Sequence, residues 1–117
     1  MTVKRIVPNV PAENVEPATS FYRDVLGMTI GMDLGWIVTF VADGSAVPQV
    51  SIAVEGGSGT PVPDLSVEVD DLDEVYARAR QAGFAVEYGP VSEPWGVRRF
   101  FVRDPFGRLL NILEHER

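Results

Sequence analysis

Two stretches of the chain have the apolar spacing of an amphipathic helix. They extend from Asn14 to Gly27 and from Asp71 to Gly83. Asn and Asp are favoured N-cap residues, and Gly suits the left-handed position after a helix. Glu74 follows Asp71 by three residues, which is a variant of the capping box. The predicted buried faces are Val15, Ala18, Tyr22, Val25 and Leu26 in the first helix, and Leu72, Val75, Tyr76, Ala79 and Ala82 in the second.

Each predicted helix follows one strand-like segment and precedes three more. The strand-like segments are Lys4–Val10, Met28–Asp33, Trp36–Ala42 and Gln49–Val54 in the first half, and Leu65–Val69, Ala85–Tyr88, Val97–Arg103 and Leu109–Glu114 in the second. The order βαβββ therefore occurs twice, which indicates an internal duplication. We predict one α+β domain over residues 1–117, with module one at 1–58, a Gly/Pro-rich linker at about 56–63 and module two at 64–117. The two modules would form a curved mixed or antiparallel sheet cleft with the helices on its outer face.

Residue alternation in the strands predicts what the face opposite the helices carries. In the last strand Leu110 and Ile112 point toward the helix, so Asn111, Leu113 and His115 point away. The same argument places Gln49, Ser51 and Ala53, and also Asp64, Ser66 and Glu68, on the face away from the helices. This face is polar without being highly charged. Such a pattern is typical of a concave ligand surface, and equally of a solvated sheet face.

Composition excludes several classes of chemistry. The 117 residues carry a formal net charge of −7 and no Cys, which excludes disulfides, thiolate metal sites and a cysteine nucleophile. Charge or Pro interrupts each apolar run before about 18 residues, so we expect a soluble, cytoplasmic protein with no membrane partner. An acidic surface repels phosphate backbones and attracts cations, so nucleic acid is not an expected partner. Solubility alone also explains this charge.

Three segments together resemble the glyoxalase / bleomycin-resistance / extradiol-dioxygenase (vicinal oxygen chelate) superfamily. These segments read FYRDVLGM, DLSVEVDDLDEVYARARQAGF and VRDPFGRLLNILEH. Within it, the chain is most similar to the bleomycin-resistance-type binding proteins, through RIVPNVPAENVEPATSFYRDVLGM and SEPWGVRRFFVRDPFGRLLNI. The resemblance covers essentially the whole chain and implies paired βαβββ modules. It also implies a homodimer whose pockets lie between the subunits.

The enzymes of this superfamily chelate a divalent metal through His and Glu. Carried over by position, the resemblance puts Val7, Asp64 and Asn111 at three of the ligand positions, with the fourth near Ser51. If a gap is allowed, Arg5 replaces Val7. One carboxylate, an amide and a hydroxyl fall short of the three strong ligands that catalytic metal sites use. The resemblance therefore predicts no metal, no cofactor and no catalytic residue here.

A rearranged metal site is the alternative. His115, the one histidine of the chain, shares its face with Asn111, so Asp64, Glu68, Asn111 and His115 can be drawn as ligands. The chain would then be a metal-dependent lyase, isomerase or dioxygenase. A histidine this near the end of the sequence is more often a solvated surface residue.

Aromatic and polar residues on the predicted cleft face favour binding over chemistry. Trp side chains stack on planar groups and attract cations, although each Trp here could also be a core residue. Phe40 and Phe101 likewise could line either the cleft or the core. The predicted ligand-binding residues are Trp36, Phe40, Ser51, Asp64, Glu68, Trp95, Arg99, Phe101 and Asn111. The hypothesis is a homodimer that sequesters a planar, cationic natural product or drug without turnover; a module that only dimerises or regulates a neighbour is a third possibility.

Overall fold

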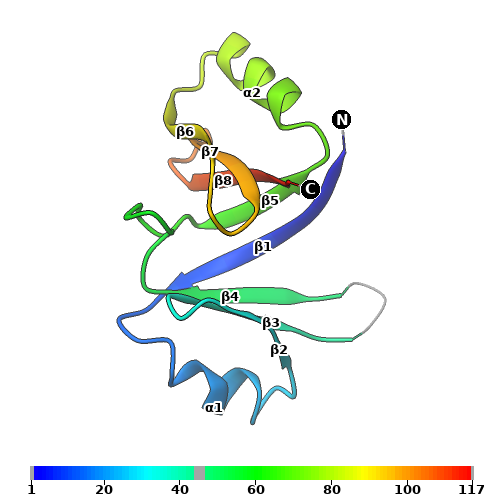
Figure 1. Ribbon diagram of the computed structural model, residues 1–117, viewed down its shortest axis with the longest axis vertical. Helices are drawn as coiled ribbons and strands as arrows, with labels where there is room; N and C mark the ends of the chain where they lie inside the picture. The colour runs from blue at the N-terminus through cyan, green and yellow to red at the C-terminus, as the bar shows by residue number, and fades with distance from the viewer. Residues whose placement is uncertain (1, 44–46, 117) are drawn as a thin grey trace. The chain divides into compact units, whose positions relative to one another are not determined.

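The chain folds into two repeats of the predicted order βαβββ, as the computed structural model shows for residues 2–43 and 47–116 (Figure 1). The elements are β1 (Val3–Pro11), α1 (Ala18–Tyr22), β2 (Thr29–Asp33), β3 (Ile37–Val41), β4 (Gln49–Ala53), β5 (Leu65–Val69), α2 (Leu72–Gln81), β6 (Val86–Ser92), β7 (Val97–Arg103) and β8 (Leu109–His115). In the described ranges, neither helix is long and apolar enough to cross a membrane.

The chain divides into two compact units. The N-terminal unit is Val7–Val62, and the C-terminal unit is Pro63–Arg117 together with Met1–Ile6. The boundary at Val62 falls inside the predicted linker. Strand β1 contributes its first residues to the C-terminal unit and its remaining residues to the N-terminal unit.

The N-terminal unit has the strand order β2-β3-β4-β1, with β1 parallel to β4 and the other pairs antiparallel. Its buried core consists of Met28, Val38, Phe40 and Ile52, against which Val15, Ala18 and Tyr22 pack. The Tyr22 ring stacks on Phe40 at a centroid distance of 5.3 Å. Helix α1 and the segment before it therefore cover one face of these strands.

The C-terminal unit has the strand order β5-β8-β7-β6, with the start of β1 beside β5. Strands β5 and β8 are parallel, and the other pairs of this order are antiparallel. The core consists of Val67, Val69, Leu72, Phe100, Val102 and Ile112, with Val75 and Tyr76 of α2 packed against it. The predicted alternation in β5 and β8 is confirmed, because Val67, Val69 and Ile112 all lie on the helix side.

Helix α2 begins and ends as its sequence predicts. The Asp71 carboxylate accepts a hydrogen bond from the Glu74 N–H at 3.1 Å, which satisfies one of the unpaired donors of the first turn. At the other end Gly83 has φ +87°, a left-handed conformation that glycine adopts without steric cost. Leu72 is fully buried, and Val75 and Tyr76 follow it on the same face.

Helix α1 is shorter than predicted, because it ends at Tyr22 instead of reaching Leu26. Its N-cap position is held by Pro17 with no side-chain cap, while the Asn14 side chain accepts from the Glu16 N–H before the helix begins. Beyond Tyr22 the chain continues in turns, and the Leu26 N–H bonds the carbonyl five residues back, at Phe21. The predicted apolar face is therefore only half buried: Val25 has 66 % of its surface exposed.

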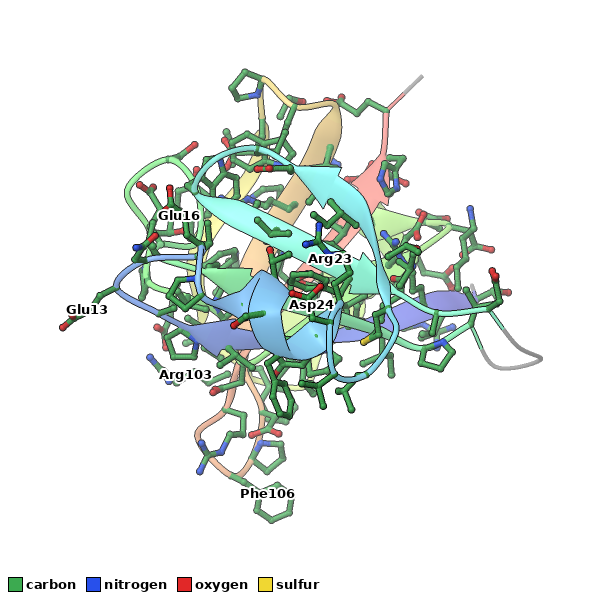
Figure 2. All side chains as sticks on the ribbon, turned by 90° about the horizontal axis from the view of Figure 1, so that it is seen from below. Glu13, Glu16, Arg23, Asp24, Arg103 and Phe106 are labelled. Carbon is green, nitrogen blue, oxygen red and sulfur yellow. The ribbon has the colours of Figure 1, made fainter. Side chains whose placement is uncertain are left out.

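The turn between β7 and β8 projects an aromatic side chain outward. The Asp104 carboxylate accepts from the N–H groups of both Phe106 and Arg108, at 2.9 Å each, which closes the turn that begins with Asp104 and Pro105. Figure 2 shows the Phe106 ring standing away from the strands, and 85 % of its surface is exposed. The turn is stabilised by its own polar groups instead of by burial.

Candidate functional site

The candidate site is the face of the C-terminal unit opposite α2. On this face Ser66 of β5, Asn111 of β8 and Phe101 of β7 are neighbours across three adjacent strands. Their chain neighbours Val67, Ile112 and Phe100 lie in the core on the helix side. Strand alternation therefore places Asn111 and Phe101, two of the predicted ligand-binding residues, side by side on the face away from α2.

Asn111 is a buried amide that is only partly satisfied. Its side-chain nitrogen donates to the Ser66 hydroxyl at 3.2 Å. Its Oδ1 accepts no hydrogen bond from any residue in the described ranges, although Asn111 is only 8 % exposed. A buried acceptor without a partner costs about 1–3 kcal/mol, so such groups call for an explanation.

Arg99 and Glu93 form a buried ion pair on the same face. The Arg99 side chain, in a residue only 2 % exposed, places Nη2 2.6 Å and Nε 2.8 Å from Glu93 Oε2. The Tyr88 hydroxyl donates to the same oxygen at 3.1 Å. Burying a guanidinium is tolerated here because its charge is balanced by a hydrogen-bonded carboxylate.

Three aromatic rings surround the Arg99 guanidinium. Its central carbon lies 4.8 Å from the ring centroid of Phe101, 4.9 Å from that of Trp95 and 5.4 Å from that of Tyr88. These distances are within the range of cation–π attraction. Trp95 and Phe101, two of the predicted ligand-binding aromatics, therefore already contact a cation of the chain itself.

Glu68 is the centre of a second polar cluster. Its carboxylate lies 3.0 Å from Arg5 Nε, 3.8 Å from Lys4 Nζ and 2.8 Å from His115 Nδ1, and its side chain is 13 % exposed. Burial alone would raise the pKa of Glu68. The hydrogen bond with His115 and the charges of Arg5 and Lys4 outweigh burial, so the pKa lies below its ordinary value of 4.5.

Asp64 fixes the start of β8 beside the start of β5. Its Oδ2 accepts from the Leu109 N–H at 2.9 Å, while its own N–H donates to the Leu109 carbonyl at 2.8 Å. Arg108 lies 3.9 Å from the other carboxylate oxygen. Asp64 therefore has both a backbone partner and a cationic partner.

The predicted site residues of the N-terminal unit have different environments. Phe40 has 0 % exposure and packs in the helix-side core, which is the core alternative for this residue. Ser51 is buried on the opposite face, with its hydroxyl 2.7 Å from that of Thr39. Trp36 is half-buried just before β3. Trp36 and Ser51 belong to the N-terminal unit, and ligand binding by these two residues stays a prediction.

Sequence reasoning missed Glu93 and Tyr88, the partners that complete the Arg99 cluster. The sequence of β7 did indicate that such partners exist. Arg99 lies between Val97 and Phe101 on one face of this strand, and all three residues are buried. A charged residue at such a position requires a partner. The sequence does not say which of several acidic residues supplies it.

The sequence profile of the Glyoxalase/Bleomycin resistance protein/Dioxygenase superfamily matches residues 3–112. The chain belongs to this superfamily. No curated protein matches the chain. The predicted resemblance and the α+β fold of paired βαβββ modules are thus confirmed.

Solved structures of low sequence identity share this superfamily fold. A superfamily member from Vibrio splendidus 12B01 aligns with a TM-score of 0.67 and 22 % identity, over 97 % of this chain and 99 % of that one. Methylmalonyl-CoA epimerase from Mycobacterium tuberculosis aligns at 0.65 and 19 %, over 98 % and 88 %. A Legionella pneumophila structure described as an NAD-dependent benzaldehyde dehydrogenase aligns at 0.76 and 16 %, over 96 % and 100 %. At these identities the likeness shows the fold alone.

The residues at the positions that the superfamily resemblance assigns to metal ligands do not suit a divalent metal. Val7 has no ligand atom, the Ser51 hydroxyl bonds Thr39, and the Asp64 carboxylate bonds the Leu109 backbone. Asn111 offers one neutral carbonyl oxygen. Among residues 2–43 and 47–116, no three His, Cys, Asp or Glu side chains gather as metal ligands would, although Glu68 and His115 of the rearranged site are in contact.

Proposed function

We propose that this superfamily member binds a small planar molecule without turnover, using the face of the C-terminal unit that carries Asn111. The single observation behind the proposal is the buried Asn111 Oδ1 that accepts no hydrogen bond from the described residues. A ligand that supplies an N–H or O–H donor would satisfy this oxygen and gain the free energy that its burial now costs.

The hydrogen bonding of Asn111 indicates which functional group the proposed ligand carries. Because its Nδ2 donates to Ser66, the carboxamide offers an acceptor to a ligand. Phe101, across the strand pair from Asn111, supplies an apolar neighbour. The proposed ligand therefore combines a flat apolar body with a hydrogen-bond donor.

The charges on this face refine the expectation of a cationic ligand. Glu68 has Arg5, Lys4 and His115 as partners, and Asp64 has Arg108. Neither carboxylate presents an unbalanced negative charge. A cation with N–H donors, such as an amidinium, fits the Asn111 acceptor, whereas a quaternary ammonium does not.

Three small phenyl compounds test the proposal by thermal shift. Benzamidine is planar, cationic and rich in N–H donors; benzamide is planar and neutral with N–H donors; phenyltrimethylammonium is cationic without any donor. Benzamidine and benzamide should raise the Tm of the wild type, and phenyltrimethylammonium should not. A ligand at 100 times its Kd stabilises by about 2.7 kcal/mol, which is several degrees for a domain of this size.

Two variants assign any binding to the proposed oxygen. Asn111→Leu removes the acceptor at similar volume and should abolish the shifts, while Asn14→Leu, at an exposed amide of the other unit, should leave them unchanged. Asn111→Leu binding both N–H donor probes, benzamidine and benzamide, as the wild type does would overturn the proposal. So would a wild type that responds only to phenyltrimethylammonium.

A metal-dependent lyase or isomerase is the second candidate, favoured by the contact between His115 and Glu68 at 2.8 Å. It predicts one equivalent of Zn, Ni, Mn or Fe per chain in protein purified without a chelating tag, lost on His115→Ala.

The homodimer that the superfamily resemblance implies is tested separately by analytical ultracentrifugation. A monomer at micromolar concentration would contradict that part alone.

A further inference from the structure

We propose that Tyr88, Trp95, Phe101 and Glu93 form a guanidinium-binding site whose occupant is Arg99 of the same chain. The internal occupant keeps ligand cations out of this aromatic cage, which makes Arg99 a residue that determines specificity. The inference shares Phe101 with the site proposed around Asn111 but does not depend on the Asn111 acceptor.

The chemistry around Arg99 matches what a cation ligand needs. Three rings face one guanidinium at centroid distances of 4.8–5.4 Å, and one carboxylate oxygen accepts from two of its nitrogens. Aromatic rings with a carboxylate are the usual means by which proteins hold alkylated ammonium and guanidinium groups. The cage therefore has the composition of a binding site that the chain itself fills.

The walls of the cage are held by groups other than the Arg99 side chain. Tyr88 lies on β6 and Phe101 on β7, which pair with each other in the sheet. The connection that carries Glu93 and Trp95 is closed by backbone hydrogen bonds, from Glu93 N–H to the Val97 carbonyl at 2.7 Å and from Gly96 N–H to the Glu93 carbonyl at 3.2 Å. We therefore expect the cage to persist when the Arg99 side chain is cut back.

A purely structural ion pair would also explain why Arg99 and Glu93 meet. The two explanations differ in what happens after Arg99 is removed. A structural pair simply loses stability, whereas a cage accepts a free guanidinium of the right shape. Chemical rescue therefore separates them.

The test uses Arg99→Ala in a Trp36→Phe background, so that Trp95 is the single tryptophan. Ethylguanidinium at millimolar concentration should raise the lowered Tm of this variant by several degrees and change the Trp95 emission saturably. The Trp36→Phe protein with Arg99 intact should show neither response, because its cage is filled. Ethylguanidinium that changes the Trp95 emission of this Arg99 protein would overturn the exclusion of ligand cations.

Matched variants separate cage binding from a general salt effect. Arg98 is the chain neighbour of Arg99, but it pairs with Asp73 at a part-exposed position, so Arg98→Ala should not be rescued. Arg99→Met fills the cage with an uncharged side chain and should not respond either. Adding Glu93→Gln to Arg99→Ala removes the counter-ion and should abolish the rescue.

Two further outcomes complete the test. If Arg99→Ala folds and ethylguanidinium raises its Tm no more than that of Arg98→Ala, the proposal is wrong. If Arg99→Ala does not fold unaided, its refolding yield with ethylguanidinium is compared with its yield in equal urea. A yield that rises only with ethylguanidinium supports the cage, and equal yields overturn it.

Discussion

On their helix-covered faces both units pack a helical tyrosine against a buried phenylalanine, stacked in the N-terminal unit and edge-to-face in the C-terminal unit. Phe40 in the N-terminal unit and Phe100 in the C-terminal unit are each 0 % exposed, and each contacts a helical tyrosine. The centroid distances are 5.3 Å for Tyr22 with Phe40 and 5.4 Å for Tyr76 with Phe100. The duplication is thus preserved where an aromatic pair joins helix to sheet.

On the opposite faces the units differ in charge. The N-terminal unit buries a neutral pair of hydroxyls, Thr39 and Ser51. The C-terminal unit buries the ion pair of Arg99 with Glu93 and places a second charged cluster around Glu68. Packing against a helix constrains one face of each sheet, whereas the other face is free to acquire polar chemistry. The candidate site lies in the unit where that chemistry is concentrated.

Removing the aromatic core residue tests whether the two helix-side cores are equivalent. Phe40→Ala and Phe100→Ala should each cost about 3–5 kcal/mol in the free energy of unfolding, because each leaves a large buried cavity. Urea unfolding followed by circular dichroism measures both. Phe106→Ala, at the exposed turn, should stay within about 0.5 kcal/mol. A cost in one unit below half of that in the other would break the equivalence.

Removing one polar partner from the face opposite the helix should cost more stability in the C-terminal unit than in the N-terminal unit. Glu93→Gln leaves the Arg99 guanidinium buried without a counter-charge and should cost about 3 kcal/mol. Ser51→Ala breaks a neutral hydroxyl pair and should cost about 1 kcal/mol. Glu87→Gln, in an exposed pair with Arg103, serves as control at about 0–1 kcal/mol. Equal costs for Glu93→Gln and Glu87→Gln in urea unfolding would refute the contrast.

The helix caps differ between the units, although the sequence gives both helices a capping residue. Asp71→Ala removes the bond to the Glu74 N–H and should cost about 1 kcal/mol. Asn14→Ala should cost less than about 0.5 kcal/mol, because Asn14 bonds Glu16 before α1 begins. Thermal unfolding of the two variants beside the wild type measures this. An Asn14→Ala loss as large as that of Asp71→Ala would show that α1 depends on its cap.

Local sequence patterns predicted the bounds of two strands correctly. Strand β7 coincides with its predicted bounds, Val97–Arg103, and so does β5 at Leu65–Val69. The predicted length of α1 was wrong. Pro17 occupies the N-cap position without a side-chain cap, and after Tyr22 turns replace the hydrogen bonds of a continued α-helix. Apolar spacing alone does not distinguish a helix from a succession of turns.

The candidate site was predictable by face but not by partner. Alternation correctly placed Ser66, Glu68 and Asn111 on the side away from α2. The partners of Glu68 come from β1 and β8, so they depend on which strands adjoin β5. Sequence periodicity predicts which side chains of a strand share a face, but it does not predict the order of the strands in the sheet. The sequence therefore could not predict that the carboxylates on this face are paired with cationic side chains.

The smallest expected effect is a pH dependence in the charged cluster of the C-terminal unit. Because the folded-state pKa of Glu68 lies below 4.5, its ionised form stabilises the fold above that pH, and the stabilisation is lost as pH falls through the folded-state pKa. The stability advantage of wild type over Glu68→Gln should therefore shrink as pH falls from about 5 toward about 3. Arg5→Met removes one of the cations that lower this pKa, so the decline should begin at higher pH. Urea midpoints measured at each pH give the difference. A wild-type advantage that stays the same across this range would show that Lys4, Arg5 and His115 do not act on Glu68, leaving Arg99 and Glu93 as the main electrostatic contrast between the units.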